Sequence, residues 1–201
     1  GITWSAVPLP TTAPIRSVSL STNFGHDLTI YAGTWGNGIY RSSDGGATWG
    51  QVNAGLNDPR VRAVVVSPNF ANDGLVFAGT DTTGVLRWDP TLNRWQPAGN
   101  GLPNTRIMAL KASPNFANDG VLVAATWGGG VAISRDRGAT WTASTNGLTS
   151  PFVRAVELAP GYPGEPQIYA GTTAGAFRSG DNGGNWGLLG APGDDLFGID
   201  V

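Results

Sequence analysis

The sequence predicts an all-β fold in which one unit of four short strands repeats about every 45 residues. Five tryptophans carry the period, because each is 45 or 46 residues from the next: Trp4, Trp49, Trp95, Trp141 and Trp186. The 201 residues include 31 glycines and 14 prolines, yet 40% of the chain is hydrophobic. A disordered chain does not carry that apolar content, so the glycines indicate many tight turns in a folded protein.

A second element recurs with the same period: IYAGT at 30–34 and 168–172, VFAGT at 76–80, and VAAT at 123–126. Each period contains four strand-like segments separated by Gly, Asn, Asp and Pro clusters, which favour turns. No segment keeps a 3.6-residue period over three turns, so we expect helix content near zero. Four antiparallel strands per repeat of this length are typical of a β-propeller blade. In the second repeat we expect the strands at 62–67, 75–79, 84–88 and 95–98.

The segments before three of the tryptophans agree in detail: SSDGGATW, SRDRGATW and SGDNGGNW. They resemble the Asp-box, or BNR repeat, S-x-D-x-G-x-T-W, of sialidases, sortilin-type receptors, xyloglucanases and the photosystem II assembly factor. The second repeat, WDPTLNRW, keeps only the final tryptophan, and the third box has Asn185 in the Thr place. The residues that carry the resemblance are Ser42, Asp44, Gly46, Thr48 and Trp49, then Ser134, Asp136, Gly138, Thr140 and Trp141, then Ser179, Asp181, Gly183 and Trp186.

The box is expected to close the turn between the third and fourth strands of a blade. Its Asp and Ser oxygens can accept bonds from backbone N–H groups, and its tryptophan buries a large aromatic surface. The alternative is that the Asp is catalytic or binds a metal. Because the box recurs from blade to blade, it suits a scaffold better than a single active site. We therefore expect no metal and no cofactor.

The repeats predict one propeller domain over 1–201, with four complete blades at about 15–52, 61–98, 106–144 and 153–189. Residues 1–14 are expected to hold the outer strand of a preceding blade, and residues 196–201 the first strand of a further one. A closed ring made from these parts would leave a blade without its middle strands and with exposed edges. The chain is therefore expected to be a stretch of a longer propeller, or to obtain the missing strands elsewhere.

One position at the start of the first strand of each blade is a candidate binding site. Aligning the repeats places Arg16, Arg62, Met108, Arg154 and Phe197 there. Propeller topology puts this position near the central axis, beside the variable loops of one face. Three arginines at a channel mouth would form an anion site, since guanidinium groups pair with carboxylates or phosphates.

The loop between the second and third strands opens on the same face. Its equivalent positions are Trp35, Asp81, Trp127 and Thr173. Tryptophans beside arginines suit stacking on sugar rings or on a partner's surface. In the alternative interpretation, the arginines bond to loop carbonyls between blades and the tryptophans cover blade edges.

The sequence supports an enzymatic function less well than a binding function. The resemblance to sialidases implies an arginine triad with a Tyr–Glu pair, but the only glutamates are Glu157 and Glu165, neither with a convincing Tyr partner. Glycoside hydrolysis needs two carboxylates on one face. The candidates for that chemistry are Asp58, Asp81, Asp194 and Asp195.

The sequence therefore favours a non-catalytic interaction platform that binds an acidic partner segment or an anionic glycan; the alternative is a glycoside hydrolase or a fragment of one. The resemblance to the photosystem II assembly factor implies arginines that meet a partner polypeptide. With a net charge of −2, no nucleic-acid binding is expected, and no apolar run is long enough to span a bilayer. Propellers with this box are commonly exported, so an extracellular or periplasmic location is expected.

Overall fold

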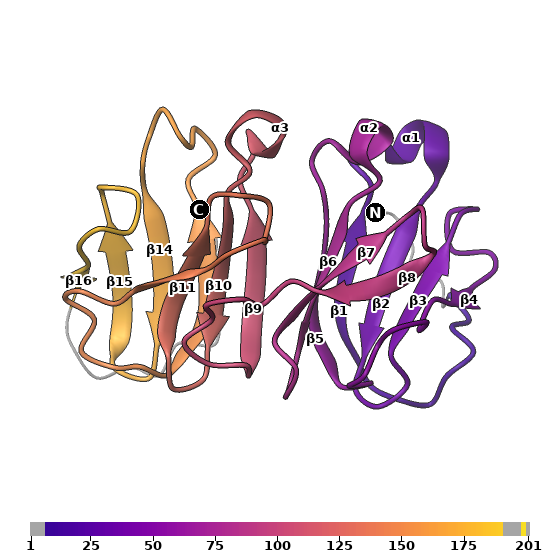
Figure 1. Ribbon diagram of the computed structural model, residues 1–201, viewed down its shortest axis with the longest axis horizontal. Helices are drawn as coiled ribbons and strands as arrows, with labels where there is room; N and C mark the ends of the chain where they lie inside the picture. The colour runs from indigo at the N-terminus through magenta and orange to yellow at the C-terminus, as the bar shows by residue number, and fades with distance from the viewer. Residues whose placement is uncertain (1–6, 191–197, 200–201) are drawn as a thin grey trace.

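The chain forms four separate four-stranded antiparallel sheets, each with its strands in chain order. The computed structural model describes residues 7–190 and 198–199. The first strands of successive sheets lie next to one another, and the remaining strands of each sheet extend outward from this inner row, as Figure 1 shows. The fold is a β-propeller, as the sequence predicted.

We number the sheets as blades 1 to 4 in chain order. Blade 1 contains β1 (Ile15–Leu20), β2 (Ile30–Thr34), β3 (Ile39–Ser42) and β4 (Gly50–Gln51), and blade 2 contains β5 (Val61–Val66), β6 (Val76–Thr80), β7 (Val85–Asp89) and β8 (Arg94–Pro97). Blade 3 contains β9 (Ile107–Ala112), β10 (Leu122–Thr126), β11 (Gly130–Ser134) and β12 (Thr142–Ser144), and blade 4 contains β13 (Val153–Leu158), β14 (Ile168–Thr172), β15 (Gly175–Ser179) and β16 (Gly187–Leu189).

Three one-turn helices were not expected: α1 (Phe24–Asp27), α2 (Phe70–Asp73) and α3 (Phe116–Asp119). Each follows the inner strand of its blade and is held by side chains. In α3, the Ser113 hydroxyl donates to Asp119 and accepts the N–H of Asn115, while Asp119 also accepts the N–H of Val121. A single turn fixed by such local bonds carries no 3.6-residue hydrophobic period, so the search for three turns missed it.

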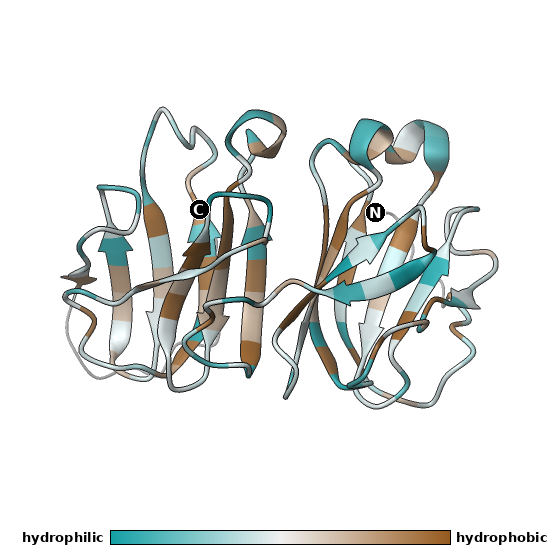
Figure 2. Cartoon of the chain, in the orientation of Figure 1, coloured by the Kyte–Doolittle hydropathy of each residue, from teal (hydrophilic) through white to brown (hydrophobic). Residues whose placement is uncertain are grey.

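The core lies between neighbouring blades, and Figure 2 shows the hydrophobic residues concentrated on the strands. Val64, Val66 and Leu86 of blade 2 pack in one buried cluster with Tyr31 of blade 1. Close approach depends on Gly33, because a Cβ there would lie 2.8 Å from Cγ1 of Val61. Blade 2 therefore presents apolar side chains to blade 1, and the absence of a side chain at Gly33 lets the two blades approach closely.

The three segments that resemble the Asp-box form the turns between the third and fourth strands of blades 1, 3 and 4. In the first, the Ser42 hydroxyl donates to Asp44 and accepts the N–H of Gly46, at 2.7 and 2.8 Å. The carboxylate of Asp44 accepts both the N–H and the hydroxyl of Thr48. Hydrogen bonds from Thr48, with a further one from Ser42, lower the pKa of Asp44 to about 2. Its carboxylate is thus engaged within the turn.

The tryptophans that carry the repeat period join neighbouring blades. The indole N–H groups of Trp95 and Trp141 donate to the carbonyls of Val52 and Ala98, at 2.6 and 2.7 Å, and both carbonyls belong to the preceding blade. Trp49 differs, because its indole N–H donates to a carbonyl of its own turn. Blade 1 has no preceding blade among residues 7–190.

The face of blade 1 that corresponds to the packed face of blade 2 is consequently apolar and exposed. Val18 and Leu20 are 57% and 49% exposed, although they correspond to the buried Val64 and Val66 of blade 2. Residues 7–14 contain no strand. Residues 1–6 lie outside the described residues, as does most of the segment 196–201, so the partial strands expected at the two ends remain predictions.

Candidate functional site

Each inner strand begins with a β-bulge, which directs one side chain out of the regular alternation. On β1, Ile15 pairs with Thr34 and Ser17 with Gly33, so Arg16 has no residue opposite it on β2. The bulges fall at the position that the sequence alignment singled out. The other residues there are Arg62 on β5, Met108 on β9 and Arg154 on β13.

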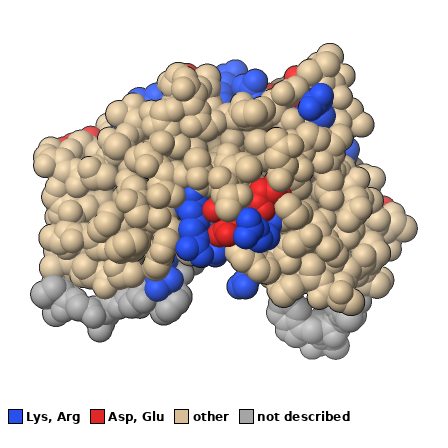
Figure 3. All heavy atoms as spheres, turned by 60° about the horizontal axis from the view of Figure 1, so that its bottom comes forward, with Lys and Arg blue, Asp and Glu red and all other residues tan. Residues whose placement is uncertain are grey.

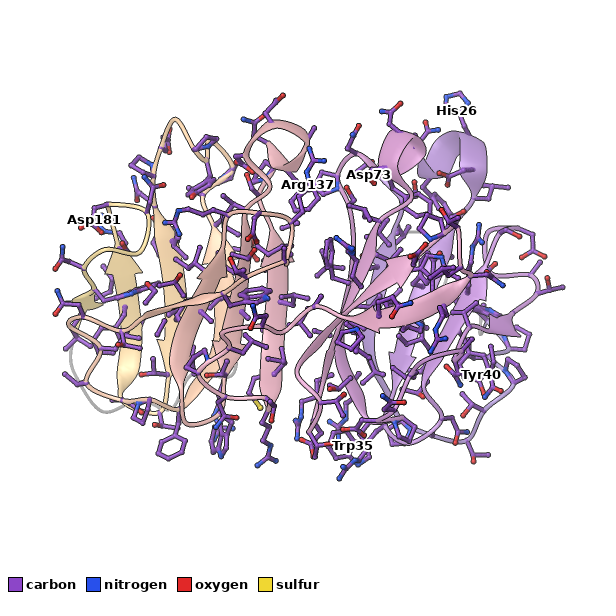
Figure 4. All side chains as sticks on the ribbon, in the orientation of Figure 1. His26, Trp35, Tyr40, Asp73, Arg137 and Asp181 are labelled. Carbon is purple, nitrogen blue, oxygen red and sulfur yellow. The ribbon has the colours of Figure 1, made fainter. Side chains whose placement is uncertain are left out.

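The loops of the blades sort onto two faces, as the topology predicted. Figure 4 shows His26 of α1 and Asp73 of α2, in the connections that follow the inner strands, at the upper edge and Trp35 at the lower edge. Figure 3 brings that lower side forward and shows basic groups gathered around acidic ones where the surface is hollowed. The bulged arginines and the variable loops therefore share one face.

Trp35, half-buried in the β2–β3 loop, is surrounded by arginines of two blades. The guanidinium carbons of Arg62, Arg16 and Arg60 lie 4.5, 5.4 and 6.0 Å from its ring centroid. An isolated β-bridge between Trp35 and Arg60 holds the loop against the start of blade 2. The indole thus serves as a platform that positions cations through their attraction to its π face.

Asp81, in the equivalent loop of blade 2, is the counter-ion of this group. One of its oxygens accepts from Nε and Nη2 of Arg62, at 2.9 and 2.7 Å, and from Nε of Arg106, at 3.0 Å. Nη1 of Arg60 lies 3.4 Å from the other oxygen. The Asp81 side chain is 11% exposed, whereas Arg60 and Arg106 are 42% and 44% exposed. The carboxylate therefore lies beneath the arginines that face solvent.

Trp127 repeats the arrangement at the junction of blades 3 and 4. The guanidinium carbon of Arg154 lies 4.6 Å from its ring centroid and that of Arg106 lies 5.9 Å away. Here a third neighbour is aromatic, because Phe152 lies 5.0 Å from Trp127 between ring centroids, at an interplanar angle of 50°. We call Arg16, Arg60, Arg62, Arg106, Arg154, Trp35, Trp127 and Asp81 together the arginine face.

Asp58 fixes the loop beneath this face. Its side chain is 2% exposed and accepts the N–H and Nε of Arg60, with the N–H and hydroxyl of Thr82 on its other oxygen. Burial raises the pKa of Asp58, but hydrogen bonds from Thr82 and Arg60 outweigh it and hold the pKa below its usual value. Asp58 is therefore a structural anion.

The structure brings together all six residues proposed from the sequence, namely Arg16, Arg62, Arg154, Trp35, Trp127 and Asp81. It adds Arg60, Arg106 and Phe152, which the sequence analysis missed. These three residues are spaced 46 apart and lie two residues before Arg62, Met108 and Arg154. The repeat alignment that found Arg62 therefore also aligns them with one another. Of the arginines proposed from the sequence, Arg62 donates to the carboxylate of Asp81, and the added Arg60 and Arg106 also donate to carboxylates.

A cavity among the inner strands adjoins the arginine face, because Arg62 belongs to both. The cavity of about 370 Å³ is lined by β1, β5 and β9, and Arg62 and Met108 belong to its wall. Further along the same strands, Nζ of Lys111 pairs with Glu157 of β13 at 2.5 Å. The cavity beside the arginine face therefore has both apolar and polar walls, and its volume is large enough for part of a ligand.

The described residues offer little for catalysis or metal binding. They contain no group of three His, Cys, Asp or Glu side chains arranged to hold a metal ion. Of the four carboxylates considered for glycoside hydrolysis, Asp58 and Asp81 are bound to arginines, and Asp194 and Asp195 lie outside the described residues. No helix within the described part is long and apolar enough to cross a membrane.

No protein-family model and no curated protein matches this chain. Solved structures do match, at high probability. An ancestral GH74 enzyme is 21% identical with a TM-score of 0.72, over 94% of this chain and 25% of that enzyme. The extracellular domain of a putative hybrid two-component system from B. thetaiotaomicron is 14% identical with a TM-score of 0.71, over 96% of this chain and 25% of that one.

A third similar structure is described as YCF48 bound to D1 peptide. It is 18% identical with a TM-score of 0.62, and the alignment covers 93% of this chain and 57% of that one. At these identities the likeness shows the propeller fold alone. This chain spans about a quarter of the length of the GH74 enzyme and of the extracellular domain.

Proposed function

We propose that this chain is a non-catalytic interaction platform that binds an acidic segment of a partner protein through the arginine face. The arrangement of arginines around Trp35, Asp81 and Trp127 carries the proposal. Five arginines and the two aspartates Asp58 and Asp81 leave this face with three net positive charges. The whole chain carries −2, with 12 Lys and Arg against 14 Asp and Glu, so the residues outside this group are net negative and the net positive charge is concentrated on this face.

The positioning of the arginines supports binding. Bulges, indole platforms and the buried counter-ion restrict the guanidinium groups before any ligand arrives. Pre-organised donors lose less conformational entropy on binding than free side chains do. The half-exposed Arg60 and Arg106 keep donors available for the paired hydrogen bonds that guanidinium makes with a carboxylate.

An acidic polypeptide suits this face better than a glycan. Stacking on a sugar needs an open, flat aromatic face, and arginines lie over both Trp35 and Trp127. Glycoside hydrolysis requires a carboxyl group that can donate a proton, but Asp58 has a lowered pKa and Asp81 bonds to arginines. The similar propeller described as bound to a peptide provides a precedent for the fold, and the similar extracellular domain is consistent with an exported location.

Binding of a synthetic peptide rich in Asp and Glu, followed by calorimetry, tests the proposal. The double variant Arg62→Gln/Arg154→Gln should weaken binding roughly tenfold or more, since a hydrogen bond to a charged group contributes about 1.5–3 kcal/mol. Arg94→Gln, on the exposed outer strand β8, removes the same charge away from the face and should leave affinity unchanged. If wild type does not bind the peptide, or the double variant binds it equally well, the proposal is wrong.

A further inference from the structure

At the junction of blades 3 and 4, an aromatic residue takes the place that an arginine has at the preceding junctions. Phe152 occupies the repeat position that holds Arg60 in blade 2 and Arg106 in blade 3. Its side chain is 40% exposed although it is aromatic. An isolated β-bridge to Trp127 fixes its backbone, as the equivalent bridge fixes Arg60 against Trp35. The same kind of β-bridge thus holds a cation at one junction and an aromatic ring at the other.

A groove lies beside Phe152. It has a volume of about 260 Å³, and Gly128, Leu148 and Pro151 are among the residues that line it. A Cβ on Gly128 would lie 3.8 Å from the Phe152 ring, and the φ of +108° at Gly128 disfavours any side chain there. The glycine therefore keeps the rim between the ring and the groove open.

Cations flank this aromatic pair and connect it with the centre of the arginine face. Arg154 and Arg106 lie over Trp127, and Arg106 also donates to Asp81 at 3.0 Å. A ligand carboxylate bound by Arg106 would place the neighbouring part of the same ligand near Phe152. An anionic group next to an apolar side chain is a common feature of peptides.

We propose that Phe152 and the adjoining groove form a subsite for an aromatic side chain of the acidic segment, next to the carboxylates that the arginines bind. This inference rests on the proposed function and specifies its ligand: an acidic peptide with an aromatic residue close to its carboxylates. Phe152 supplies an exposed ring for edge-to-face contact, and the groove supplies depth. The Trp127 ring is already covered by Arg154, which favours a peptide side chain over a stacked sugar.

Two synthetic peptides and three proteins test the subsite. The peptides are acidic and identical except that one carries Phe where the other carries Ala. Wild type should bind the Phe peptide roughly tenfold more tightly, and Phe152→Ala should lose that preference while still binding the Ala peptide as wild type does. Phe152→Arg recreates the residue of blades 2 and 3; it should lose the preference and bind the Ala peptide more tightly.

The outcomes separate the two proposals. If neither peptide binds to wild type, the proposed function fails and the subsite fails with it. If wild type binds both peptides equally, or Phe152→Ala weakens both equally at an unchanged melting temperature, the platform stands and the subsite is wrong. Binding of an anionic oligosaccharide that depends on Phe152, without a preference for the Phe peptide, overturns the assignment of a peptide to this groove.

Discussion

The guanidinium of Arg62 lies over the indole of Trp35, with its central carbon 4.5 Å from the ring centroid. The two residues belong to different blades, and the same guanidinium bonds to Asp81. Arg62 therefore joins an aromatic platform of blade 1 to an anion of blade 2. This relationship distinguishes an ordered cationic surface from a set of mobile basic side chains.

Replacing Trp35 should disturb this order. Trp35→Thr places at this position the residue that blade 4 has there, so the loop should still form. Without the platform, Arg16, Arg60 and Arg62 gain conformational freedom, and we expect affinity for an acidic peptide to fall about threefold to tenfold, in line with roughly 0.5–2 kcal/mol for a cation–π contact. Calorimetry checks this. Unchanged affinity would support the alternative that Trp35 only covers a blade edge.

Removal of the counter-ion should change stability and binding in opposite directions. Asp81→Asn keeps the shape of the side chain but leaves the arginines without their shared carboxylate, so the free energy of unfolding should fall by about 1–3 kcal/mol. Affinity for an acidic peptide should rise, because the positive charge of the face increases by one. Chemical denaturation and calorimetry measure the two effects. Weaker binding would instead mean that the order Asp81 imposes on Arg62 and Arg106 matters more for affinity than the negative charge it adds.

The extent to which the sequence predicted this structure depends on the kind of signal. The strands expected for the second repeat, 62–67, 75–79, 84–88 and 95–98, each lie within one residue of β5, β6, β7 and β8, because the alternation and the turn residues are local. The three one-turn helices were missed, since they depend on side-chain bonds rather than on hydrophobic periodicity. Alignment of one repeat position also found Arg62 without revealing the bulge that redirects it.

The two faces of β1 show a second feature that the sequence pattern did not predict. Arg16, Val18 and Leu20 alternate with serines, a pattern that ordinarily predicts a buried apolar side. In the structure the serine side is the packed one: the N–H groups of Val64 and Val66 donate to the hydroxyls of Ser17 and Ser19. Whether an apolar face is buried depends on the neighbouring blade, which alternation within one strand does not specify.

The close approach between blades predicts a strong effect of a single methyl group. In Gly33→Ala, the new Cβ would lie 2.8 and 2.9 Å from side-chain carbons of Val61 and Val64, so the blades must separate. We expect a loss of about 1–3 kcal/mol in the free energy of unfolding. Gly25→Ala is the matched control, because a Cβ there meets nothing within 4 Å. A neutral Gly33→Ala would show that β2 and β5 move apart without cost.

The exposed face of blade 1 and the buried face of blade 2 should respond differently to truncation. Leu86 is 2% exposed and Leu20 is 49% exposed. Leu86→Ala should therefore cost about 2–5 kcal/mol, whereas Leu20→Ala should change stability by no more than about 0.5 kcal/mol. Denaturant unfolding of both variants checks the contrast. A large cost for Leu20→Ala would mean that another element covers this face.

The turns that resemble the Asp-box should make stability sensitive to acid in a narrow range. The pKa values of Asp44 and Asp181 are both lowered to about 2 from an ordinary value of 3.8, chiefly by hydrogen bonds from Thr48 and Asn185. A carboxyl with a lowered folded-state pKa stabilises the fold above its unfolded pKa, and this contribution is lost as the pH falls toward the folded value. The melting temperature should therefore fall as the pH decreases from about 4 to about 2.

Thr48→Val removes the strongest of these bonds at Asp44 and should raise the pKa of Asp44, which NMR titration of the carboxyl carbon measures. An unshifted titration of Asp44 in that variant would mean that the Thr48 hydroxyl does not stabilise the ionised carboxylate.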